Sequence, residues 1–192
     1  MATMIRTASA LACAALLTGL LGAAPSARAA QVAGITLSPT ETVQGRQLRL
    51  AGCGVREELW MDLYAVSLYL PQGTPADASR IRDSSVPKLL QLDVTYDGSV
   101  PNGLPDEWAQ RLREQVSREF IRTLQNQYND LKHGDTVRIA YVPNDGTTLS
   151  VNGRVVTTRS GSELMDAMLD LWIGTDPISR NLKRLLLSGS CG

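Results

Sequence analysis

The sequence has few of the residues that build metal sites and catalytic triads. Among its 192 residues are a single histidine, His133, and three cysteines. Structural zinc sites use cysteine and histidine ligands, commonly with a Cys-x-x-Cys pair, and no such pair occurs in this sequence. His133 stands beside Gly134, where a helix is expected to end, so we predict that it lies on the surface. We therefore expect no metal, no cofactor and no serine–histidine–acid triad.

An excess of charge of either sign is also missing. Lysine and arginine together number 19, as do aspartate and glutamate, so the formal net charge is zero. Proteins that bind nucleic acids usually carry a basic patch or a basic excess. We therefore expect no nucleic-acid partner.

The apolar run near the N-terminus is short and rich in alanine. Arg6 precedes it, residues 8–24 form it, and the small-x-small sequence Ala27-Arg28-Ala29 follows it. This pattern predicts a signal peptide over residues 1–29 and a mature domain over residues 30–192, exported to the bacterial periplasm. No membrane span is expected after cleavage. Cys13 lies inside the apolar run rather than after it, so we do not expect lipidation.

Cys53 and Cys191 remain after cleavage. In an exported protein an even pair of cysteines favours a disulfide, which would tie the C-terminal segment to the centre of the chain. The alternative is two unpaired thiols.

The central segment, residues 48–70, reads LRLAGCGVREELWMDLYAVSLYL. Gly52-Cys53-Gly54 interrupts it, and it then resumes as a run in which odd-numbered and even-numbered positions are both mostly apolar. A strand that is apolar on both faces is covered on both faces, so we predict an interior strand that places Trp60 in the core.

Arg56 introduces a permanent cation into this apolar segment, and a buried charge needs a partner. One possible partner is a neighbouring carboxylate, that of Glu57, Glu58 or Asp62. The other is a bound ligand.

Short periodic segments fill the rest of the chain. Alternating apolar residues predict strands at residues 31–37, 47–70, 87–96, 135–142, 147–151 and 154–159. Helical spacing predicts helices at residues 76–82, 163–172 and 178–187, and one long helix of about six turns with an apolar stripe from Trp108 to Tyr128. Because the strands come in neighbouring pairs, we predict one α+β domain with helices on a face of an antiparallel sheet.

Three blocks of the sequence, in a fixed order, share a pattern with a known family. The first joins Gly52-Cys53-Gly54-Val55-Arg56 to residues 63–70, and the second runs from Gly134-Asp135 through Gly146-Thr147 to Asn152-Gly153. The third is LWIGTDP at residues 171–177, followed by residues 181–187. With this order and spacing, the chain resembles the chalcone isomerase-like family. The resemblance implies an open-faced β-sandwich, a large antiparallel sheet with helices layered on it.

The family contains both enzymes and binding proteins. In plant chalcone isomerases an arginine steers a phenolate in its attack on an enone, with threonine, tyrosine and asparagine side chains shaping the site. In the fatty-acid-binding members an arginine and a tyrosine hold a carboxylate over an apolar cavity. The resemblance places Arg56 at the shared arginine. It places Tyr64 where the isomerases have a threonine and the binding members have a tyrosine.

Other positions also depart from the isomerase pattern. The C-terminal threonine of the isomerases falls on Leu171, whose alkyl group forms no hydrogen bond, and their tyrosine and asparagine fall on Trp108 and Gln115. The resemblance therefore implies a non-catalytic binder of a small apolar carboxylic acid such as a fatty acid, held by Arg56 and Tyr64.

Two alternatives stay open. One is an isomerase or lyase of a phenolic or enone substrate, in which Arg56 would be the catalytic residue that stabilises oxyanion charge. The other is a structural or partner-binding protein whose Arg56 forms an internal salt bridge.

Arg56 and Tyr64 can share a ligand only if the chain reverses between them. On one continuous strand, residues eight apart would be about 26 Å apart. A reversal within residues 58–61 would place them across a hairpin, although no Asn-Gly or Asp-Gly marks a turn there. Taken singly, Tyr64 and the three tryptophans are predicted to be core aromatics.

Overall fold

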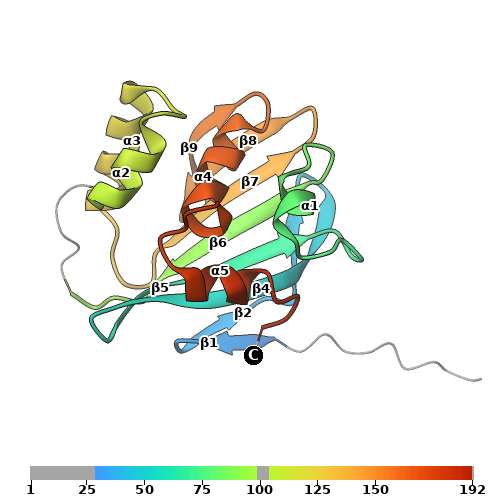
Figure 1. The fold of residues 1–192 in the computed structure, drawn as a ribbon, viewed down its shortest axis with the longest axis horizontal. Helices are drawn as coiled ribbons and strands as arrows, with labels where there is room; N and C mark the ends of the chain where they lie inside the picture. Colours follow the sequence, from blue (N-terminus) through green and yellow to red (C-terminus); the bar gives the residue numbers. More distant parts are fainter. Residues whose placement is uncertain (1–28, 99–103, 192) are drawn as a thin grey trace, which may run out of the picture.

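The computed structural model describes residues 29–98 and 104–191. Apart from Ala29, the predicted signal peptide, including Cys13, lies outside the described residues. The described chain forms one large antiparallel sheet of seven strands, with helices against one of its faces (Figure 1). This is the α+β arrangement that the sequence predicts.

The strands of the large sheet follow one another in sequence order. They are β3 (Thr40–Val43), β4 (Arg46–Glu58), β5 (Met61–Leu70), β6 (Lys88–Val94), β7 (Thr136–Val142), β8 (Gly146–Val151) and β9 (Arg154–Arg159). A separate two-stranded sheet pairs β1 (Ala30–Val32) with β2 (Ile35–Leu37). The helices are α1 (Ala78–Arg82), α2 (Asp106–Leu112), α3 (Arg118–Asn129), α4 (Glu163–Ile173) and α5 (Arg180–Leu186).

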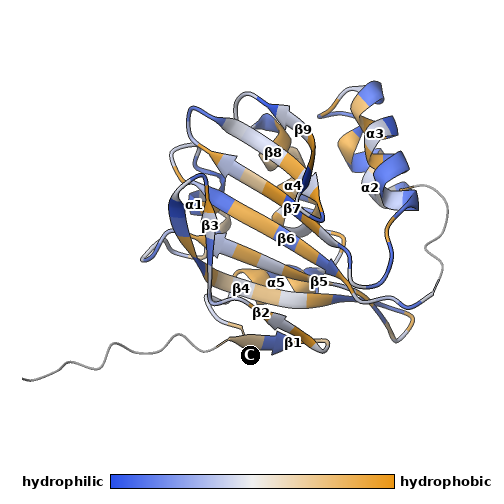
Figure 2. Cartoon of the chain, turned by 180° about the vertical axis from the view of Figure 1, so that it is seen from behind, coloured by the Kyte–Doolittle hydropathy of each residue, from blue (hydrophilic) through white to orange (hydrophobic). Residues whose placement is uncertain are grey.

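The main core lies between the inner face of the sheet and the helices. Alternate residues of the central strands point to this face, among them Val66 and Leu68 of β5 and Leu90 of β6, all at most 1% exposed. Helix α4 covers them with Leu171 and Trp172, which are fully buried. The opposite face, seen in Figure 2, carries a smaller cluster around Tyr69 and Leu89.

The predicted interior strand is confirmed for β5, which pairs with β4 on one side and with β6 on the other. The prediction for Trp60 is wrong. Trp60 belongs to the turn between β4 and β5, and its side chain is 95% exposed. The sequence between residues 48 and 70 contains no residue typical of a turn near position 60, so the apolar run suggests one continuous strand. The turn is formed by Leu59 and Trp60 themselves.

Two glycines of β4 explain why the strand can carry α5. A Cβ atom at Gly52 would overlap the backbone carbonyl of Leu186, and one at Gly54 would lie 2.7 Å from Cδ1 of Leu182. Helix α5 therefore lies directly on the β4 backbone, which only glycine permits.

The disulfide between Cys53 and Cys191 is present, as predicted. Cys53 stands between the two glycines, and alternation along the strand turns its side chain to the opposite face. The segment that follows α5 is thus fixed to the strand that α5 covers.

The predicted long helix is two helices, α2 and α3. The side-chain oxygen of Ser117 accepts a hydrogen bond from the Phe120 backbone N–H at 3.2 Å, so Ser117 is the N-cap of α3. The apolar stripe continues across the break, which is why its periodicity suggests one helix. The predicted strand at residues 31–37 is likewise two short strands, joined by a turn at Ala33 and Gly34 with φ values of 47° and 78°.

Candidate functional site

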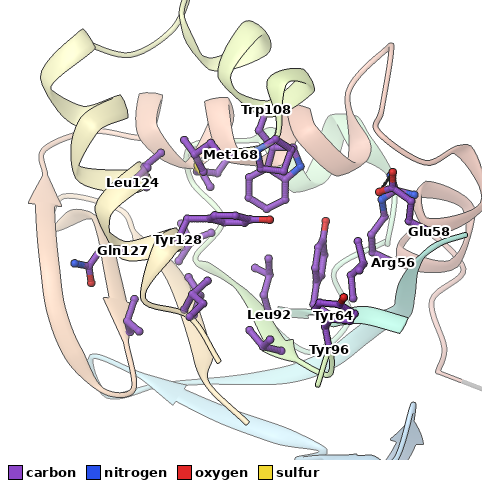
Figure 3. Close-up of a pocket in the computed structure, with 18 of the residues that line it drawn as sticks. Arg56, Glu58, Tyr64, Leu92, Tyr96, Trp108, Leu124, Gln127, Tyr128 and Met168 are labelled. Carbon is purple, nitrogen blue, oxygen red and sulfur yellow. Dashed lines mark hydrogen bonds and ion pairs between the residues drawn. The ribbon is translucent and has the colours of Figure 1, made fainter. Parts of the chain in front are cut away.

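A cavity of about 510 Å³ lies between the inner face of the sheet and helices α2, α3 and α4 (Figure 3). Its floor includes Leu92 of β6, Ile139 of β7 and Leu149 of β8, and Met168 of α4 and Leu124 of α3 lie above. The cavity thus has an apolar floor from the sheet and an apolar roof from the helices. The volume falls within the range of ligand sites, about 300–1,000 Å³.

Arg56 and Tyr64 lie side by side on neighbouring strands at this end of the sheet. In the antiparallel pairing of β4 with β5 they are directly opposite, and the pairing closes at Glu58 and Met61. The chain reversal that the family pattern requires is thus present. Both side chains line the cavity, because residues opposite each other in an antiparallel pair point to the same face.

The position of Arg56 follows from the strand on which it lies. Gly52, Gly54 and Arg56 share one face of β4, and the two glycines lie beneath α5. Arg56 is the next residue on that face, so its side chain emerges beyond the helix and enters the cavity.

Arg56 is 15% exposed and already contacts neighbouring residues. Its Nη1 donates to the backbone carbonyl of Glu57 at 2.7 Å, and its Nη2 lies 3.3 Å from Oε2 of Glu58. Glu58 also lines the cavity, and its side chain is 54% exposed. The salt bridge that the sequence left open as an alternative is therefore present, at the rim of the cavity.

Tyr64 belongs to a group of aromatic side chains beside the cavity. Nε1 of Trp172 donates to the Tyr64 hydroxyl at 3.2 Å. The Tyr64 ring meets Trp108 and Trp172 edge-on, with centroid distances of 6.0 and 6.5 Å. This packing and the hydrogen bond hold the Tyr64 hydroxyl at a defined place in the cavity.

Tyr128 of α3 is a polar group of the cavity that the sequence analysis assigned only to an apolar stripe. It lines the cavity, and its hydroxyl points across it toward Tyr64 in Figure 3. Burial raises the pKa of Tyr128, so the phenol stays protonated and can donate a hydrogen bond. A tyrosine at the end of an otherwise aliphatic stripe is the sequence signal that could have indicated this role.

The sequence pattern of the chalcone isomerase-like family matches this chain over residues 29–188. The chain belongs to this family.

The structure of this chalcone isomerase-like protein is similar to the crystal structure of a fatty-acid-binding protein of Arabidopsis thaliana. The TM-score is 0.57 at 18% sequence identity, over 82% of this chain and 95% of the plant protein. At this identity the likeness establishes the shared fold. No match was found among curated proteins.

The three remaining positions carried over from the isomerases differ in where they lie. Trp108 lines the cavity. Gln115 is exposed in the link between α2 and α3 and borders a smaller groove, so its expected place at the site is wrong. Leu171 is fully buried and is not among the described residues that line the cavity.

His133 lies outside the cavity, on the surface of the protein. His133 is 55% exposed, and its Nδ1 lies 2.9 Å from both the Thr95 carbonyl and Oδ1 of Asp97, which fits the predicted surface position. Within residues 29–98 and 104–191, no group of three or more His, Cys, Asp or Glu side chains could hold a metal ion. In the same residues no helix has both the length and the apolar character needed to cross a membrane.

Proposed function

We propose that this protein is an exported, non-catalytic binder of a small apolar carboxylic acid, such as a fatty acid. The observation that carries the proposal is the position of Arg56 and Tyr64, which face each other at one end of an apolar cavity of about 510 Å³. The carboxylate would lie beside these two side chains, and the hydrocarbon chain would extend along the floor formed by β6, β7 and β8.

The head-group chemistry suits a carboxylate. A guanidinium can donate two parallel hydrogen bonds to one carboxylate. Glu58 now supplies a carboxylate to Arg56, and its side chain is 54% exposed, so it can turn into solvent when a ligand replaces it. Tyr64 accepts from Trp172, and a hydroxyl also has a proton to donate.

The lack of turnover is proposed from the groups around Arg56. The isomerases place threonine hydroxyls and an asparagine around the reacting atoms. This chain has Tyr64 and the buried Leu171 at two of those positions, and Gln115 lies outside the cavity. Export is proposed from the leader-like residues 1–29 and from the Cys53–Cys191 disulfide, a bond typical of oxidising compartments.

The test is binding of a fluorescent fatty acid to the mature protein, together with native mass spectrometry to detect any acid that copurifies. Arg56→Ala removes the charged hydrogen bonds to the carboxylate, so the affinity should fall about 10- to 100-fold. Glu58→Gln removes the competing carboxylate and keeps the side-chain size, so the affinity should rise severalfold.

The two variants are expected to change ligand affinity in opposite directions, and this difference distinguishes a ligand-binding Arg56 from one that forms only a structural salt bridge. If Arg56 serves only its pair with Glu58, both substitutions should lower stability alike and neither should change ligand affinity. No binding of any fatty acid by the unchanged protein would contradict the proposal, and turnover of an enone lost in Arg56→Ala would point to the isomerase alternative.

A further inference from the structure

The turn between β4 and β5 exposes an unusual set of side chains. Leu59 is 67% exposed, Trp60 95% and Met61 38%. Val155 on β9 is the other large apolar residue that stands exposed in the described chain. Three of these four residues are thus consecutive. Scattered single apolar residues are normal on a protein surface, whereas a cluster marks an interaction site.

The backbone of this turn does not explain the choice of Leu59 and Trp60. Their φ values are 46° and 60°, as in the two-residue type I′ turn, which strongly prefers Asn-Gly. A leucine and a tryptophan in this left-handed conformation are strained. The turn would form more easily with other residues, so its backbone conformation does not account for a leucine and a tryptophan at these positions.

The turn is also part of the cavity. Leu59 and Met61 line it, next to Arg56 and Glu58. The β4–β5 hairpin projects beyond the neighbouring strands at that end of the sheet (Figure 1). A surface that covers the turn would therefore also lie against the rim of the cavity.

The charges beside the turn narrow the choice of partner. Glu57, Glu58 and Asp62 are exposed around it. Two copies of this chain that met through their turns would bring these carboxylates together, which is unfavourable. The same carboxylates disfavour an anionic membrane. A neutral, zwitterionic lipid surface avoids both conflicts, and tryptophan is the side chain typical of the membrane–water interface.

We propose that Leu59, Trp60 and Met61 insert into the interfacial layer of a zwitterionic phospholipid surface and hold the cavity rim against it. The apolar side chains enter the lipid, and the flanking carboxylates remain among the head groups. The role of this contact, exchange of an apolar acid between lipid and cavity, rests on the proposed function. The contact itself does not.

Flotation of the mature protein with phosphatidylcholine vesicles tests this contact. We expect the protein to float with the vesicles and its tryptophan emission to shift to the blue. The shift reports on Trp60, because Trp108 is 8% exposed and Trp172 is fully buried.

A double variant separates the contact from folding. Leu59→Asn with Trp60→Gly installs the residues that the turn prefers, so the unfolding temperature should be equal or higher, while vesicle affinity should fall about tenfold or more. Val155→Ser removes the exposed apolar side chain of β9 and should leave flotation unchanged.

The remaining outcomes test the lipid contact and the proposed fatty-acid binding separately. A protein that binds fatty acid but does not float overturns the lipid contact and leaves the proposed function standing. A protein that floats but binds no fatty acid supports the contact and overturns the proposed function. Tighter binding to anionic than to zwitterionic vesicles, flotation kept by the double variant, or a dimer that the double variant abolishes would overturn the contact.

Discussion

Lys88 places an ammonium group inside the core. The residue is fully buried, its Nζ donates to the Asp83 carbonyl at 3.0 Å, and it lies 4.9 Å from the centre of the Tyr141 ring. Burial lowers the pKa of Lys88 from 10.5 to about 8. The folded protein therefore releases this proton at a lower pH than the unfolded chain does.

This difference predicts an unusual dependence of stability on pH. Between about pH 8 and pH 10.5 the unfolded chain binds more protons at Lys88 than the folded protein, so the free energy of unfolding should rise with pH, by up to roughly 3 kcal/mol. Above pH 10 the trend should reverse, because burial raises the pKa of Tyr69 to about 12 and the unfolded chain ionises first. Urea unfolding from pH 7 to pH 11 measures both limbs.

The control for this profile is Lys88→Met, which keeps the length and apolar stem of the side chain. The rise between pH 8 and pH 10 should disappear in this variant, while the fall above pH 10 should remain. A rise of equal size in the variant would assign the effect to another group.

At the scale of single residues, the sequence shows which side chains matter better than it shows what they contact. A permanent charge in an apolar segment identifies Arg56, and the family pattern places Tyr64 opposite. The Glu58 contact depends on the local geometry near the turn, so three acidic neighbours are equivalent in the sequence. Trp60 is misplaced because burial is the general expectation for an apolar residue, and a turn built from Leu59 and Trp60 carries no turn signal.

Among the elements, the contact between α5 and β4 determines where Arg56 lies. Gly52→Ala would push a methyl group into the Leu186 backbone, which cannot move without the helix, so the free energy of unfolding should fall by about 3 kcal/mol or more. Gly54→Ala meets side-chain atoms of Leu182 and Leu185 rather than the helix backbone and should cost less, about 1–2 kcal/mol. Denaturant unfolding of both variants measures the difference.

A displaced α5 would also disturb the β4 backbone that carries Arg56, so fatty-acid affinity should fall more in Gly52→Ala than in Gly54→Ala. Equal stability of the Gly52→Ala variant and the unchanged protein would show that α5 can shift freely on β4.

The elements divide into those with a strong period and those decided by a single residue. Most strands of the large sheet, and helices α4 and α5, follow from alternation or helical spacing within a few residues of their observed bounds. The break between α2 and α3 depends on one capping interaction at Ser117, and the break between β1 and β2 depends on the conformation of Ala33 and Gly34. Periodicity averages over such single-residue effects. It therefore misses them.

In the whole molecule, the Cys53–Cys191 disulfide closes a loop with a sequence separation of 138. In the chain-entropy description, a loop of this length stabilises the folded state by about 4–5 kcal/mol, because the bond restricts the unfolded chain. Unfolding by urea with and without reductant should show a loss of this order.

The double variant Cys53→Ser with Cys191→Ser should match the reduced protein in stability and should not respond to reductant. Two reactive thiols in the native protein would contradict the bond. The whole-molecule fold was the most predictable part, because paired strands and the three family blocks each extend over much of the chain.

The same disulfide determines how a single proteolytic cut in the chain would be detected. The exposed β4–β5 turn lies between residues 53 and 191, as do all elements from β5 to α5. A protease that cuts the chain once at this turn therefore leaves both fragments covalently joined. The nicked protein would migrate as one species on a gel without reductant and would separate into two only after reduction. A gel run without reductant would therefore not reveal the cleavage.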